Sequence, residues 1–174
     1  DRLSAMLGPK AEDVWASTFH SACVRILRRD IDRLGFASSF TIYDTDDSLR
    51  VIKDCMKDLN LDDKQFQPRS ILGYISRAKD AMKLADEYLA ECEKSGDYRL
   101  IKIAKVYSEY QRRLWEANAL DFDDIILHTV RLLQQFEEVR GYYQRKFRYV
   151  LIDEYQDTNN LQYLLASALA GGYE

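Results

Sequence analysis

The sequence predicts a mainly α-helical fold that carries a small remnant of a parallel α/β sheet. Between residues 36 and 118, apolar side chains recur every three to four positions, the spacing of amphipathic helices, and the breaks between helices are short. Residues 149–152 form instead a continuous apolar run, which is typical of a strand buried on both faces of a parallel sheet. We therefore expect residues 1–35 and 119–174 to belong to an α/β core, with residues 36–118 as an inserted helical subdomain.

The composition is that of a globular protein. The 174 residues are 47% hydrophobic and 31% charged, and no apolar run approaches the roughly 20 residues that span a bilayer. The first residues show no signal-peptide pattern, so we expect a cytoplasmic protein without membrane partners. The formal net charge of −4 does not indicate nucleic-acid binding, so any contact with DNA must come from local basic patches. Cys23, Cys55 and Cys92 are widely spaced and are expected to be free thiols.

The first segment is predicted to contain a short strand, Val14 to Thr18, followed by a helix that Ser21 caps and Gly35 ends. A strand that leads through Thr18 and His20 into a helix is a possible anion site, because the first helical N–H groups have no partner within the helix.

The inserted subdomain is predicted to open with a strand, Phe40 to Tyr43, after which Asp44 caps a helix that runs to Leu59. Further on, a helix from Leu84 is stopped at Gly96. Asp97 then opens the longest helix of the chain. The apolar stripe of this helix contains Leu100, Ile103, Ala104, Tyr107, Tyr110 or Gln111, and Leu114.

Ser70 is predicted to start the helix between these two regions, with its basic residues facing outward. A helix start flanked by Arg69 and Ser70 could hold the backbone of a duplex without reading its bases. The alternative is an ordinary amphipathic helix. The basic residues expected on the outer side are Arg69, Arg77, Lys79 and Lys83.

Phe122 lies between carboxylates at the start of the next helix, which Asp121 is suited to cap. An aromatic side chain on an acidic helix start suggests a partner that covers it, and nucleic-acid bases stack on aromatic rings for about 1 to 3 kcal/mol each. The alternative is a hydrophobic staple, in which Phe122 packs against the next helical turn.

Asp153 and Glu154 end the apolar run, at the place where open α/β sheets bind their ligands. A hard cation such as Mg²⁺ takes one or two carboxylates together with phosphate oxygens, and a second carboxylate can orient or deprotonate a water. This arrangement suits phosphoryl transfer to water. The alternative is a polar turn leading into a helix that Asp157 or Thr158 caps.

Three stretches together resemble motifs of superfamily 1 DNA helicases of the UvrD/PcrA/Rep type, in that family's order. They are STFHS at residues 17–21, similar to motif Ib; LDFDD at residues 120–124, similar to the short motif before motif II; and DEYQDTN at residues 153–159, similar to motif II, the Walker B box. The resemblance implies an ATP-dependent DNA helicase that acts in DNA repair or replication and is built on RecA-like cores of the P-loop NTPase class.

The resemblance also implies roles for individual residues. Asp153 would hold the Mg²⁺ of ATP, Glu154 would polarise the attacking water, and Gln156 would couple the nucleotide state to the DNA track. Residues expected to contact single-stranded DNA are Thr18, His20 and Phe122, and those expected to contact duplex DNA in the inserted subdomain are Arg69, Ser70 and Lys79.

The phosphate cradle that such an ATPase needs, Gly-x-x-x-x-Gly-Lys-Ser/Thr, does not occur in the sequence. We therefore expect the chain to be a fragment that works with the remaining helicase domains and has neither ATP nor Mg²⁺ bound on its own. Two alternatives stay open: a DNA- or protein-binding module without catalysis, and the motor part of a helicase-nuclease subunit.

Overall fold

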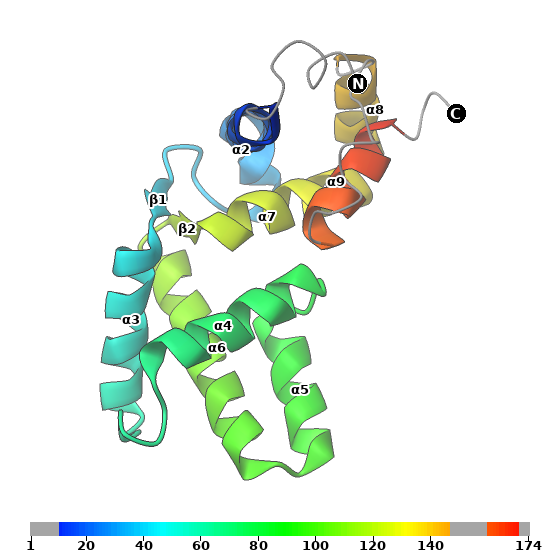
Figure 1. The fold of residues 1–174 in the computed structure, drawn as a ribbon. Coiled ribbons are helices and arrows are strands. Elements are labelled where there is room, and N and C mark those ends of the chain that lie inside the picture. The colour runs from blue at the N-terminus through cyan, green and yellow to red at the C-terminus, as the bar shows by residue number, and fades with distance from the viewer. Residues whose placement is uncertain (1–10, 147–159, 171–174) are drawn as a thin grey trace. The chain divides into compact units, whose positions relative to one another are not determined.

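The computed structural model describes residues 11–146 and 160–170 (Figure 1). The chain divides into two compact units: Phe40–Asp124 forms one, and Asp1–Ser39 together with Ile125–Glu174 forms the other. Within the described ranges, no helix is long and apolar enough to cross a membrane.

The Phe40–Asp124 unit begins and ends with the two strands of a small parallel sheet. β1 (Thr41–Tyr43) pairs with β2 (Ala119–Asp121), and Tyr43 lies opposite Asp121. Parallel strands require a crossover connection, because a short turn cannot return the chain to the same end of the sheet. The helices between the strands provide this connection.

Four helices connect β1 to β2, and each buries one apolar face. They are α3 (Thr45–Asp58), α4 (Pro68–Asp80), α5 (Ala85–Ser95) and α6 (Tyr98–Glu116), of which α5 and α6 run side by side (Figure 1). Their shared core consists of Ile52, Cys55, Met56, Phe66, Ile71, Ile75, Ala78, Ile103, Val106, Tyr107, Tyr110, Leu114 and Ala119. The loop before α4 is fixed to α6, because the Arg99 guanidinium lies 4.7 Å from the centre of the buried Phe66 ring.

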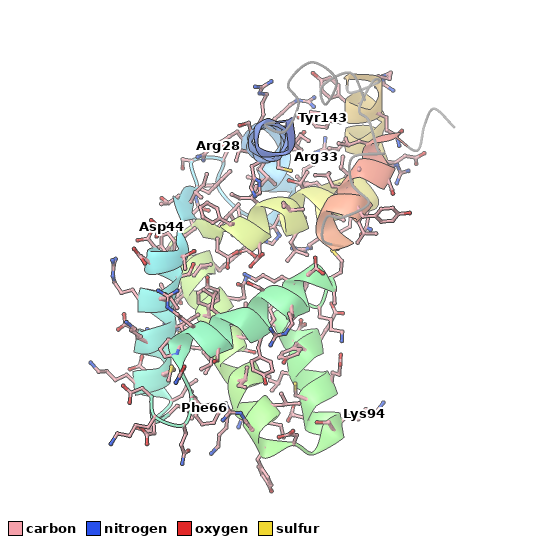
Figure 2. The ribbon with its side chains drawn as sticks, viewed as in Figure 1. Arg28, Arg33, Asp44, Phe66, Lys94 and Tyr143 are labelled. Carbon is pink, nitrogen blue, oxygen red and sulfur yellow. The ribbon has the colours of Figure 1, made fainter. Side chains whose placement is uncertain are left out.

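Two predicted helix starts and one predicted stop in this unit are confirmed by their local structure. Asp44 caps α3 (Figure 2) in a capping box with Asp47. Asp97 accepts hydrogen bonds from the first N–H groups of α6. Gly96 ends α5 with a φ of 74°, in the left-handed region that a residue without a Cβ adopts most readily.

In the other unit, the regular elements of the described part are all helices. It contains α2 (Ala11–Asp30), the 3₁₀ helix η2 (Ile31–Leu34), α7 (Phe122–Gln135), which begins in the Phe40–Asp124 unit, α8 (Glu137–Lys146) and α9 (Asn160–Ala170). The Arg29 guanidinium lies 3.9 Å from the centre of the Tyr142 ring, which joins α2 to α8. Gln144 donates a hydrogen bond of 2.7 Å to the Ala168 carbonyl, which joins α8 to α9.

The predicted fold class, mainly α with a small parallel sheet, is confirmed, and so is the strand predicted from Phe40 to Tyr43, which is β1. The prediction of a strand from Val14 to Thr18 is wrong, because these residues belong to α2. A short strand needs neighbouring strands to satisfy its backbone groups, whereas a helix satisfies most of them within itself. The predicted strand at residues 149–152 lies outside the described residues.

Candidate functional site

The predicted site residues fall into three groups in the structure. Asp153, Glu154 and Gln156 lie outside the described residues. Thr18 lies within α2, and His20, on the same helix, is half-buried. The remaining predicted residues belong to the Phe40–Asp124 unit, where they form two separate features: an acidic helix start around Phe122 and a basic hollow beside Arg69.

The acidic helix start is built by a capping box. The Asp124 N–H donates to Asp121 Oδ1 at 2.8 Å, and the Asp121 N–H donates to Asp124 Oδ2 at 3.3 Å. The box satisfies donors that a helix N-terminus leaves without partners. Asp121, predicted from the sequence as the cap, is also the last residue of β2. This short strand was missed because three residues show no recognisable periodicity.

Lys79 completes the helix start from within the core. Its side chain is fully buried, with Nζ 2.7 Å from Asp121 Oδ2 and 2.9 Å from Asp124 Oδ1. The Tyr110 hydroxyl donates a hydrogen bond of 2.7 Å to the same Asp121 oxygen. Two helices, α4 and α6, thus supply partners for the carboxylates that start α7.

The prediction that Lys79 faces outward and contacts DNA is therefore wrong. Lys79 follows Ile71 and Ile75 at successive four-residue steps on α4, which places it in the buried stripe of the helix. The spacing was visible in the sequence. What the sequence did not reveal was the pair of carboxylates that makes a buried ammonium group tolerable.

The buried charges shift the pKa values of the three groups in different directions. Burial lowers the pKa of Lys79, but the carboxylates of Asp121 and Asp124 outweigh burial and raise it well above its usual value. Burial raises the pKa of Asp121, but Lys79 and the hydrogen bond from Tyr110 hold it below its usual range. Burial and the negative charge of Asp121 raise the pKa of Asp124 to about 7. The cluster thus pairs one ammonium with one firmly ionised carboxylate and one that titrates near neutral pH.

Phe122 is held at the surface by these buried neighbours. It is the first residue of α7, and 48% of it is exposed. The carboxylate on its other side, Asp123, accepts a hydrogen bond of 2.6 Å from the Ser76 hydroxyl on α4. The side chains before and after Phe122 are therefore both anchored, while a large part of the aromatic ring faces solvent.

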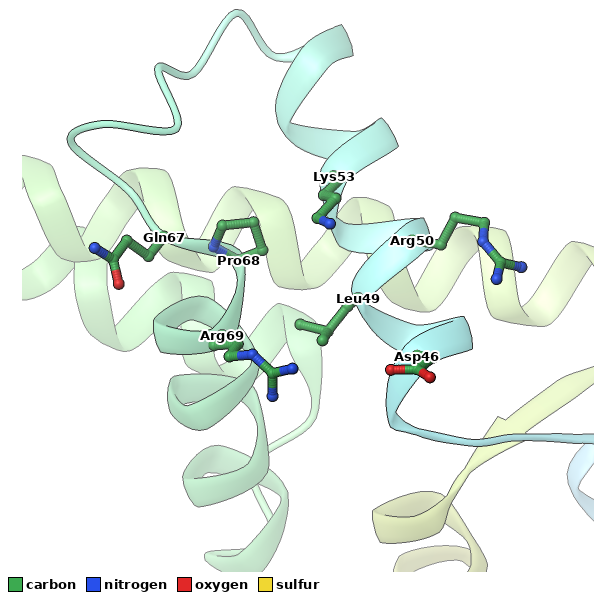
Figure 3. Close-up of a pocket in the computed structure, with 7 residues that line it drawn as sticks. All are labelled: Asp46, Leu49, Arg50, Lys53, Gln67, Pro68 and Arg69. Carbon is green, nitrogen blue, oxygen red and sulfur yellow. The ribbon is translucent and has the colours of Figure 1, made fainter.

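The basic hollow lies between α3 and the start of α4 and has a volume of about 580 Å³ (Figure 3). Arg69 reaches from the start of α4 toward α3, which contributes Arg50 and Lys53. All three cations are exposed. The complete lining is Asp46, Leu49, Arg50, Lys53, Gln67, Pro68 and Arg69, which includes three cations and one carboxylate.

The start of α4 adds backbone donors to this hollow. The helix begins at Pro68, two residues before the predicted start at Ser70, in agreement with the preference for proline in the first turn. Its N-cap residue, Gln67, makes no side-chain capping hydrogen bond. Arg69 and Ser70 both lie exposed in the first turn, where N–H groups and the helix dipole favour an anion.

Comparison with known protein families places the whole chain in one group. Residues 1–174 match the family model described as "UvrD/REP helicase N-terminal domain". Over 174 residues the chain is 49% identical to a Bacillus subtilis protein and 47% identical to a Staphylococcus aureus protein, each named "ATP-dependent DNA helicase PcrA". The Staphylococcus epidermidis protein of the same name is 45% identical over 173 residues. Nearly the whole chain is covered in each case, but it spans only 23% of each relative.

Proposed function

Because the chain belongs to the UvrD/REP helicase N-terminal domain family, we propose that it is part of an ATP-dependent DNA helicase and provides contacts to both single-stranded and duplex DNA. The observation that carries this proposal is the match over the full 174 residues, including 49% identity to a protein named as a DNA helicase. The helicase activity belongs to the whole protein, together with its remaining domains, ATP and Mg²⁺. The proposed boundaries of the inserted subdomain are residues 36 and 118, and a bacterial cytoplasmic location fits this role.

The acidic pair after residue 152 is proposed to act on the nucleotide. Asp153 would hold Mg²⁺, which would supply charge neutralisation for the phosphates when bound. Glu154 would orient and polarise the attacking water, and Gln156 would transmit the state of the nucleotide to the DNA track. The support for these roles is the donor set itself, two adjacent carboxylates that can divide these two tasks between them.

Phe122 is proposed to stack on a base of single-stranded DNA, and Thr18 and His20 are each proposed to contact single-stranded DNA as well. Every base has a π face, so an exposed aromatic ring binds single strands with little sequence preference. The 48% exposure of Phe122 on an otherwise anchored helix start supports this role.

The basic hollow is proposed to hold the backbone of duplex DNA. Arg50 and Lys53 lie one turn apart on α3, and Arg69 faces them from the start of α4. Phosphate contacts of this kind position a duplex without reading its sequence. The hollow also explains how a chain of net charge −4 can contribute to DNA binding, because its cations are concentrated locally.

The catalytic part of the proposal is tested by Glu154→Gln in the full-length protein. Glutamine keeps the shape of the side chain but cannot take up a proton, so DNA-stimulated ATP hydrolysis should fall at least about a hundredfold. Binding of a fluorescent nucleotide should stay within about twofold of the native value. A variant that still hydrolyses ATP at the native rate would refute the role of Glu154, and a native protein without DNA-stimulated hydrolysis would refute the function.

The hollow is tested by Arg69→Ala, with duplex DNA that carries a single-stranded tail as the probe. We expect weaker binding to all sequences alike. In a plot of the logarithm of the binding constant against the logarithm of the salt concentration, the slope should be smaller in magnitude by about one. Lys83→Ala is the matched control, because Lys83 is also a partly exposed cation of this unit but pairs with Glu91 at 2.9 Å, outside the lining of the hollow. Equal effects of the two substitutions would mean that the hollow has no particular role.

A further inference from the structure

Lys79 carries a charge into a position that apolar residues usually occupy. It lies in the same stripe of α4 as Ile71 and Ile75, and its side chain has no exposed surface. Burying an ammonium group is unfavourable unless partners surround it, and replacing a whole buried ion pair by apolar side chains is often neutral or stabilising. Stability alone therefore does not account for a lysine at this position.

The partners of Lys79 are the two capping residues that surround Phe122 in the sequence. Nζ lies within 2.9 Å of a carboxylate oxygen of both Asp121 and Asp124, which are themselves joined by the capping box. Tyr110 holds Asp121 from α6. Short hydrogen bonds between charged groups are directional as well as strong, so they set the position of the first turn of α7 more narrowly than apolar packing does.

We propose that Lys79 is a positioning residue for Phe122: through Asp121 and Asp124 it fixes the first turn of α7, so that the exposed ring is already placed to receive a nucleic-acid base. This inference rests on the proposed stacking role of Phe122. A ring held in place before binding loses less conformational freedom when the base arrives, and this raises affinity without any new contact. Lys79 thus contributes to DNA binding from a site that DNA never touches.

The test uses the full-length protein and a single-stranded oligothymidine that contains one 2-aminopurine, whose fluorescence is quenched when the base stacks. Phe122→Leu should abolish the quenching contributed by this ring and weaken binding about tenfold. The positioning variant is Lys79→Met combined with Asp121→Asn. It removes one positive and one negative charge together, and asparagine keeps an oxygen that can accept the Asp124 N–H.

We expect this charge-balanced variant to fold, as judged by circular dichroism, but to lose both quenching and affinity to an extent similar to Phe122→Leu. Adding Phe122→Leu to it should cause little further loss, because both changes act on the same contact. Lys83→Met removes a partly exposed lysine that lies outside this cluster and should behave like the native protein.

The proposal is overturned if the folded charge-balanced variant quenches like the native protein, or if its loss simply adds to that of Phe122→Leu. If Phe122→Leu alone changes nothing, the proposed stacking function fails instead, which is a different result. Should the charge-balanced variant not fold, Lys79→Gln decides, since it removes the ammonium group that contacts Asp121 and Asp124 while glutamine keeps an N–H donor for them. Native quenching in that variant refutes the positioning role.

Discussion

The two acidic helix starts of the Phe40–Asp124 unit have the same sequence pattern and opposite surroundings. Residues 44–47 and 121–124 both read Asp-x-Asp-Asp; the first stretch follows β1, and the second begins at the last residue of β2. Each also forms a capping box of two hydrogen bonds. Their lengths are 2.8 and 3.1 Å in the first box and 2.8 and 3.3 Å in the second. The first box lies at the surface, where Asp47 Oδ1 is 3.6 Å from Nη1 of the exposed Arg50. The second box is buried and pairs with the ammonium group of Lys79.

The difference between the boxes appears in the charge state of their carboxylates. Hydrogen bonds from the backbone of Asp47 lower the pKa of the exposed Asp44. Burial and the neighbouring Asp121 raise the pKa of Asp124 to about 7. The local sequence therefore determines where a helix begins, while the tertiary environment determines what the carboxylates of the cap can do. Three predictions test this separation, in order of decreasing effect.

Replacing Lys79 by methionine should have the largest effect. Methionine fills a similar volume but leaves Asp121 and Asp124 buried without their counter-ion, and breaking a buried ion pair in this way typically costs about 3 to 5 kcal/mol. The free energy of unfolding, measured with urea at neutral pH, should fall by this order of magnitude. Lys83→Met is the control, because that ammonium group is partly exposed and pairs only at the surface. Equal losses in the two variants would show that the buried box is no different from a surface one.

Replacing Asp124 by asparagine should change how stability depends on pH. The folded pKa of about 7 lies above the usual value of 3.8, so the native protein binds more protons than the unfolded chain between these two values. Native stability must therefore decrease as pH rises through this window, by up to about 1.4 kcal/mol per pH unit from this group. Below the window both states are protonated, and above it both are ionised, so the contribution no longer changes.

The measurement is the difference in unfolding free energy between the native protein and Asp124→Asn at several pH values. Asparagine cannot titrate, so the difference should depend on pH across the window and be flat above it. Asp44 provides the opposite case, because its lowered pKa makes its contribution disappear only as pH falls below its usual value. A difference that is flat throughout the window would mean that Asp124 ionises normally.

The same separation explains which features could be predicted from the sequence. The helix starts at Asp44, Asp97 and Asp121 and the stops at Gly35 and Gly96 depend on hydrogen bonds within a few residues, so a local pattern was sufficient. The three-residue strand β2 was not predicted, because its pairing partner lies far away in the sequence, at β1.

Two of the errors at named residues have the same origin; the helix start predicted at Ser21 is also wrong, because α2 begins at Ala11. The charge of Lys79 predicts a position at the surface, whereas its four-residue spacing from Ile75 indicates a buried one. A charged lysine can occupy the buried position because the carboxylates of Asp121 and Asp124 pair with it. The strand predicted from Val14 to Thr18 rested on the local sequence pattern, but strands depend on neighbours that a local pattern does not contain. The roles of Arg69, Ser70 and Phe122 in DNA binding stay predictions, supported by their exposure.

Replacing Asp44 by alanine should have the smallest effect, because this box is exposed and its loss leaves no buried charge. The side chain no longer accepts the Asp47 N–H, but water can take its place at the surface. We expect the melting temperature to fall by no more than a few degrees and α3 to lose helicity mainly in its first turn, as amide hydrogen exchange can measure. Arg50→Ala, which removes only the surface ion pair with Asp47, should leave the melting temperature unchanged within error. If Asp44→Ala instead destabilised the protein as much as Lys79→Met, the cap itself, rather than the buried charges, would account for the strength of both boxes.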